Sequence, residues 1–248
     1  DLNRTLPEDS PPFRIIGLSV RQNWSMVESE KDMRDPEIVS QVFATGIPDV
    51  VKADAIRKEI INKDEKGLIF VSSQHAYTAF EAKEYTENAA ESGLSDTRRG
   101  GNIIYDLIGN RSATVLMHGP WPYKKAQLLS VFPADGVFDK LIDDLPEDRQ
   151  SVGLLVTSPE LIDIRAGRSD YSYEYDGLKL SDMCDGYILL GPINEYEVVS
   201  PIADFITEDN IATTIANFPG AAPGDITVEE MNDYIASLTT NRKTFLAK

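Results

Sequence analysis

Five short runs of apolar residues punctuate the chain and predict five β-strands. They are residues 13–20, 68–75, 112–118, 151–157 and 185–191. Helical patterns separate most of these runs, and the second to fifth begin roughly 35 to 45 residues apart, which is the rhythm of βα units. The runs are continuously apolar, as in strands that helices cover on both faces. The pattern predicts an α/β fold with a mainly parallel sheet of about five strands, helices on both faces, and a single domain over residues 1–248.

Local capping chemistry predicts where several helices begin. Asp35 before Pro36 is a typical helix start, and a second start follows at Pro48–Asp49. The sequence from Thr227 to Glu230 is a capping box for the last helix. Other helices are predicted near residues 103–109, 135–142 and 211–215.

Two stretches carry no clear period and are expected to be irregular. Residues 81–99 are mostly polar, and residues 161–183 are rich in Asp, Ser and Tyr. Connections of this length in a compact domain are usually functional lids or excursions from the fold.

The two histidines of the chain both end predicted strands. His75 ends the second run and His118 ends the third. Ligands of parallel α/β sheets bind outside the carboxyl ends of the strands, so the two imidazoles are expected to share one cleft. Histidine suits proton transfer or metal ligation, although a lone histidine beside an apolar run is more often a structural residue.

Carboxylates beyond the later strands supply candidate partners for these histidines. Glu160 and Glu195 follow the fourth and fifth predicted strands. Two histidines and one carboxylate match a zinc or iron site, whereas histidine with a nearby glutamate equally matches metal-free activation of water. The chain has no HExxH motif or other close ligand spacing, so the sequence signal for a metal site is weak.

Basic and aromatic residues near the same predicted strand ends are candidates for ligand binding. Arg98 and Arg99 precede two glycines at a helix start, where guanidinium and backbone N–H groups can hold a carboxylate, phosphate or oxyanion. The alternative is a solvated turn with a glycine that allows close packing. Tyr77 and Trp121 can wall a pocket, or pack over the edge of the sheet.

Composition narrows the classes of partner. The net charge of −17 repels phosphate backbones, which argues against nucleic-acid binding. The predicted cleft instead indicates a small-molecule ligand or substrate. No apolar run approaches the roughly 18 residues of a membrane span, so no transmembrane segment is expected. The single cysteine, Cys184, excludes an intrachain disulfide and is expected to be a packing residue. Composition leaves open the oligomeric state, and whether the protein is cytoplasmic or exported after processing.

The middle fifth of the chain resembles the erythromycin-esterase-like proteins. It is similar to a wider superfamily that includes the ChaN-like haem-binding lipoproteins and the TraB/Tiki proteins. The matching pieces are Leu68–His75, Arg99–Gly100 with Ile103 to Gly109, and Thr114–His118. The resemblance implies an α/β fold with a cleft at one end of the sheet. It also implies that histidine and glutamate activate water without a metal in the esterase branch, and that other branches bind haem or metal.

The resemblance carries His75 over as the candidate base and Arg99 as the anion-holding group. Esterase-like members also have a glutamate and a further histidine upstream, but no histidine precedes His75 here. The domain is therefore expected to lack an N-terminal portion of the family fold. One hypothesis is a hydrolase, and the alternative is an inactive relative that binds haem, a divalent metal or a small ligand. The candidate catalytic residues are His75, His118 and Glu160, and the candidate ligand-binding residues are Arg98, Arg99, Trp121, Tyr77 and Glu195.

Overall fold

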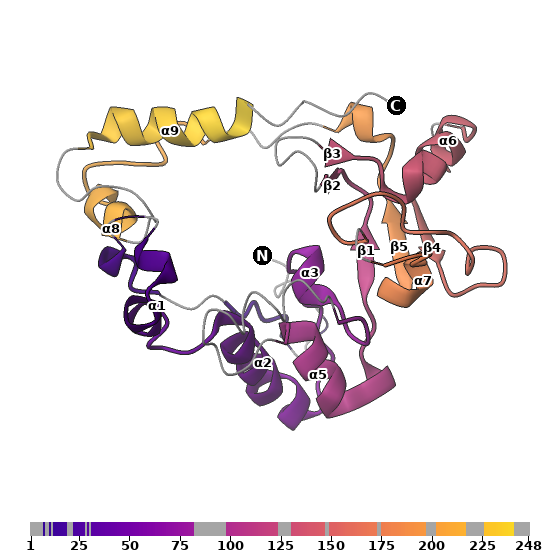
Figure 1. The fold of residues 1–248 in the computed structure, drawn as a ribbon, viewed down its shortest axis with the longest axis horizontal. Coiled ribbons are helices and arrows are strands. Elements are labelled where there is room, and N and C mark those ends of the chain that lie inside the picture. Colours follow the sequence, from indigo (N-terminus) through magenta and orange to yellow (C-terminus); the bar gives the residue numbers. More distant parts are fainter. Residues whose placement is uncertain are drawn as a thin grey trace.

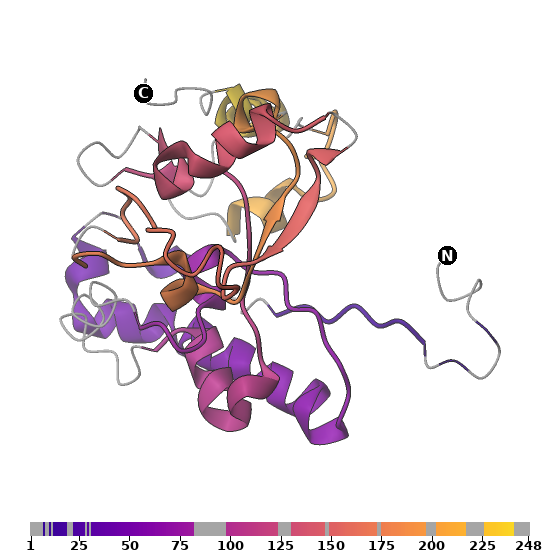
Figure 2. The ribbon, with the colours of Figure 1, turned by 90° about the vertical axis from the view of Figure 1, so that its right-hand side faces the viewer.

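The computed structural model separates a helical region from a region built around strands (Figure 1). It describes residues 12–18, 22–27, 31–81, 98–123, 130–146, 149–172, 175–196, 202–216 and 226–240, together with Pro7, Ser10 and Ser29. Helices α2 (Pro48–Glu59) and α5 (Gly100–Ile108) lie together at the end of the molecule opposite α6 (Val137–Asp143) and α9 (Val228–Thr240) (Figure 1 and Figure 2).

The strands form two small sheets. In the first, the order is β1 (Val115–Met117), β5 (Gly186–Leu189) and β4 (Val152–Leu155). Strand β5 is parallel to β1 and antiparallel to β4. Strands β2 (Trp121–Pro122) and β3 (Ser130–Val131) form a separate antiparallel pair.

The predicted sheet of five mainly parallel strands is therefore wrong. Residues 12–18 and 65–72 have no strand pairing in the structure. The apolar side chains of this second run do not pack on a core, since Leu68 is 98% exposed and Phe70 is 83% exposed. A short apolar run gives the same pattern whether or not a neighbouring strand pairs with it. His75 does not end a strand but lies in the single-turn helix α3 (Ser73–Ala76).

The antiparallel direction of β4 follows from its connection to β5. A parallel neighbour needs a crossover, usually through a helix that packs on the sheet. Between β4 and β5 the described residues make turns, an isolated bridge between Arg165 and Lys179, and the short helix α7 (Leu180–Met183). The stretch 161–183, which was predicted to be irregular, therefore contains the helix α7 in its last four residues. Most of the other one, residues 82–97, lies outside the described residues.

Helices with local start signals form as predicted. The Asp35 side chain accepts a hydrogen bond from the Glu37 amide at the start of α1 (Pro36–Val42). Thr227 and Glu230 exchange hydrogen bonds ahead of α9, and α8 (Ile211–Ala216) forms where its apolar pair indicates. The helix near residues 135–142 was expected to begin with Asp135 as its cap, but α6 begins after Gly136. The carboxylate of Asp135 instead accepts hydrogen bonds from Arg168. No helix among the described residues is long and apolar enough to cross a membrane.

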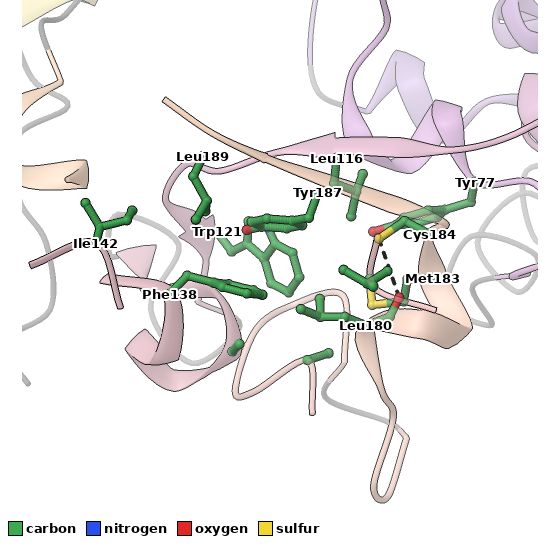
Figure 3. Close-up of a cluster of buried hydrophobic side chains, with 13 residues drawn as sticks. Tyr77, Leu116, Trp121, Phe138, Ile142, Leu180, Met183, Cys184, Tyr187 and Leu189 are labelled. Carbon is green, nitrogen blue, oxygen red and sulfur yellow. Dashed lines mark hydrogen bonds between the residues drawn. The ribbon is translucent and has the colours of Figure 1, made fainter. Parts of the chain in front are cut away.

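Two hydrophobic cores support the two regions. The larger joins the three-stranded sheet to α6 and α7 and includes Phe138 stacked on Tyr187 at 4.7 Å (Figure 3). The smaller joins α2 to α5 through Ala53, Ile56 and Ile104. Tyr77, two residues after His75, belongs to the larger core, whereas Ile104 of α5 belongs to the smaller one.

Candidate functional site

The candidate site forms where the first turns of α2 and α5 meet α3. Asp49 is the second residue of α2, directly after the Pro48 that opens the helix. Its carboxylate Oδ1 accepts a hydrogen bond of 3.0 Å from the amide of Gly100, the first residue of α5. Two helix N-termini therefore face one carboxylate, and both favour its negative charge.

The same carboxylate holds the imidazole of His75. The Nδ1 atom of His75 lies 2.7 Å from Oδ1 and 2.9 Å from Oδ2 of Asp49. Burial acts to raise the pKa of Asp49, but the hydrogen bond and charge of His75, the Gly100 amide and the charge of Lys52 outweigh it and lower the pKa. Asp49 is thus an ionised, buried carboxylate at neutral pH.

The position of the proton on the His75 ring follows from that charge. An ionised carboxylate can only accept hydrogen bonds, so Nδ1 carries a proton, and in the singly protonated form of the ring the lone pair is on Nε2. Nε2 makes no hydrogen bond with any described residue, and the side chain is 26% exposed. Nε2 of His75 can therefore accept a proton from solvent, while the Asp49 carboxylate fixes the orientation of the ring through Nδ1.

Arg99 connects Asp49 to a second side chain of α3. Its Nη1 lies 3.8 Å from Oδ2 of Asp49, and its Nη2 donates to Oε1 of Gln74 at 3.0 Å. The Arg99 side chain is 12% exposed, so its guanidinium lies on the buried side of the site. The two residues of α3 that face it, Gln74 and His75, are held by one buried charge pair.

The glycine pair after Arg99 allows the close approach of α5. A Cβ at Gly101 would lie 2.3 Å from the carbonyl oxygen of Tyr77 and 2.8 Å from that of Ala76. Only glycine lets this helix start press against the backbone that follows His75. Asn102 completes the junction, because its side-chain amide donates to the carbonyls of Thr78 and Phe80.

The sheet anchors α3 through Thr114. The Thr114 hydroxyl donates to the carbonyl of Ala76 at 2.7 Å, and its amide donates to Asp185 at 2.8 Å. Thr114 precedes β1 and His118 follows it. At about 3.3 Å per residue, these two residues are roughly 13 Å apart, so His75 and His118 lie at opposite ends of the strand.

His118 has different surroundings. Its side chain is completely buried, with Nδ1 3.1 Å from the Tyr187 hydroxyl and Nε2 3.3 Å from Asp139. Both ring nitrogens are therefore occupied, and the ring packs edge-on against Phe138. The structure does not bring His118 into the site of His75.

The other sequence candidates are dispersed. Glu160 is exposed after β4 and Glu195 is exposed after β5, and these strands run in opposite directions, so the two carboxylates lie at opposite ends of the sheet. Arg98 pairs with Asp106 at the surface of α5. Tyr77 and Trp121 pack in the larger core (Figure 3). Each of the two rings also meets Tyr171 edge-on.

Cys184 is buried in the same core as expected. Its thiol donates to the carbonyl of Leu180 (Figure 3), and burial raises the pKa of the thiol to about 12. It is not a nucleophile at neutral pH.

Sequence reasoning missed Asp49 and Gln74. Asp49 stood out only as an acid in a helix start, and its partners His75 and Gly100 are 26 and 51 positions away. A polar residue next to a singled-out histidine was the only available hint for Gln74. Among the residues that the structure describes, no three His, Cys, Asp or Glu side chains converge as a metal-ligand set.

Comparisons with protein-family models, with curated proteins and with solved structures find no match. The geometry of the His75 site therefore carries the functional argument.

Proposed function

We propose that the chain is a hydrolase in which His75 activates a water molecule. The single observation that carries this proposal is the hydrogen bond between Nδ1 of His75 and the buried carboxylate of Asp49, with Nε2 left open. A base oriented in this way by a carboxylate is the arrangement that proton-transfer catalysis uses. The ester class of substrate comes from the resemblance of residues 68–118 to the erythromycin-esterase-like proteins.

The proposed roles follow from the atoms at the site. Nε2 of His75 takes a proton from water as the oxygen attacks the ester carbonyl. Asp49 stabilises the imidazolium that forms, and Nε2 then returns the proton to the departing alcohol. Arg99 is a positioning residue, because its guanidinium faces Asp49 and Gln74 from the buried side. His118 has no part in this proposal, because its ring nitrogens contact Tyr187 and Asp139 beyond the other end of β1. Glu160 has none either, because no hydrogen bond or ion pair joins it to His75 or Asp49.

Asp49→Asn tests the proposal most directly. The Gly100 amide and Nδ1 of His75 can both still donate to the Asn oxygen, because both contact Oδ1 of Asp49. The substitution removes the negative charge that stabilises the imidazolium, in a nearly unchanged structure. We expect kcat for p-nitrophenyl acetate and longer p-nitrophenyl esters to fall about 10²- to 10⁴-fold, and His75→Ala to lose as much.

Asp54→Asn is the matched control. Asp54 lies on the same helix, but its carboxylate is exposed and pairs with Arg57 and Lys58, so the same substitution should leave kcat unchanged. Full activity of His75→Ala on every ester that the wild type hydrolyses, or no hydrolysis by the wild type, would refute the proposal.

Metal binding is the second candidate, because a carboxylate on the far nitrogen also orients metal-ligating histidines. Activity of the wild type that disappears on chelation and returns with Zn²⁺ would favour it over metal-free water activation.

A further inference from the structure

The side-chain amide of Gln74 is fixed in one orientation beside the proposed base. Arg99 can only donate hydrogen bonds, so the atom 3.0 Å from its Nη2 must be the amide oxygen of Gln74. The Nε2 amide group of Gln74 consequently points away from the guanidinium. It makes no hydrogen bond with any residue that the structure describes, which leaves two N–H donors available.

His75 and Gln74 are consecutive residues of α3, and their side chains bind the two members of one ion pair, Asp49 and Arg99. Asp49 binds the imidazole, and Arg99 lies against both Asp49 and the Gln74 oxygen. Each side chain is only partly exposed and has one open nitrogen: an acceptor on His75 and a donor on Gln74. Acyl transfer requires a hydrogen-bond donor that reaches the carbonyl oxygen, because negative charge develops on that oxygen as the base removes a proton.

We infer that Gln74 is a further catalytic residue that stabilises the oxyanion of the tetrahedral intermediate. Water oxygen bonds to the ester carbon, its proton passes to Nε2 of His75, and the carbonyl π electrons move onto the carbonyl oxygen. The Gln74 N–H group donates to that oxygen. The oxygen lone pair then reforms the C=O bond, the C–O bond to the alcohol breaks, and the imidazolium returns the proton to the alcohol oxygen. The substrate in this proposal is a neutral carboxylic ester.

Two substitutions at Gln74 test the donor role. Gln74→Glu keeps an oxygen that accepts from Arg99 and removes both donors, while Gln74→Met removes the donors without adding charge. We expect both to lower kcat for p-nitrophenyl acetate about 10- to 10³-fold. The affinity for p-nitrophenyl methylphosphonate, a charged tetrahedral mimic, should fall by a similar factor, while KM for the neutral ester changes little.

Gln41→Glu is the matched control, because Gln41 is exposed on α1 and the same change there should alter neither constant. Gln74→Glu with wild-type kcat and phosphonate affinity would mean that Gln74 only holds Arg99. Gln74→Met with wild-type kcat would also overturn the assignment. This inference rests on the proposed function, and His75→Ala separates the two failures. Loss of activity in His75→Ala with full activity in the Gln74 variants refutes Gln74 alone, whereas full activity in His75→Ala refutes both.

Discussion

The imidazoles of His75 and His118 have opposite surroundings. His118 is fully buried, and its nitrogens meet the Tyr187 hydroxyl and the Asp139 carboxylate. Because the carboxylate only accepts, Nε2 of His118 carries the proton and Nδ1 accepts from Tyr187, whose pKa is raised by burial. In His75 the carboxylate is on Nδ1 instead, and Nε2 remains open. The first arrangement stabilises a core, and the second suits proton transfer.

His118→Ala is expected to destabilise the protein strongly. The substitution leaves a cavity beside Phe138 and removes the partner of the buried Tyr187 hydroxyl and of the partly buried Asp139 carboxylate. Together these losses cost about 2–4 kcal/mol of unfolding free energy. Tyr187→Phe, which removes only the hydroxyl, should cost about 1 kcal/mol. Urea denaturation of the three proteins measures both values. A stable His118→Ala protein that has lost esterase activity would instead place His118 in the reaction.

At the scale of secondary structure, the site depends on how closely α5 approaches the backbone after α3. This close approach requires glycine at position 101, because a Cβ there would lie 2.3 Å from the carbonyl oxygen of Tyr77. Alanine is intrinsically better than glycine in a helix by about 1 kcal/mol. A backbone oxygen cannot move aside as a flexible side chain can, so the clash should outweigh that gain.

Gly101→Ala should therefore lower the unfolding free energy by about 1–3 kcal/mol and reduce esterase activity with it. Gly153→Ala is the control, because a Cβ at Gly153 in β4 meets no atom within 4 Å and should change stability by less than about 0.5 kcal/mol. Chemical denaturation and kcat of both variants test the expectation. Equal stability of the two would show that α3 and α5 do not pack this closely.

The accuracy of the sequence predictions depended on whether the decisive contacts are local. The helix starts at Asp35 and Thr227 were predicted correctly, because capping involves residues two or three positions apart. The strand at residues 68–75 was wrong, because a strand needs a distant partner that its own apolar pattern does not reveal. His75 and Arg99 were singled out as rare or clustered residue types, but only the fold brings Asp49 between them.

At the scale of the whole molecule, Asp49 is unusual among the many carboxylates that give the net charge of −17. Exposed acids such as Asp54, whose pKa is lowered by hydrogen bonds from Lys58 and Arg57, are screened by salt. Asp49 is buried where the helical region meets α3, so salt screens it far less. Its ionisation should therefore affect the stability of the junction between the two regions.

The acid dependence of unfolding isolates this contribution. The pKa of Asp49 is lowered in the folded state from its ordinary value of 3.8, so the stability from its ionised form is present above that value and is lost as the pH falls below it. Urea denaturation of wild type and Asp49→Asn from about pH 5 to about pH 3, in about 0.5 M NaCl, measures the difference in unfolding free energy. We expect the advantage of the wild type to shrink as the pH falls, because the other carboxylates are common to both proteins and cancel. An advantage that is constant or grows toward low pH would mean that Asp49 is not held as the charged partner of His75.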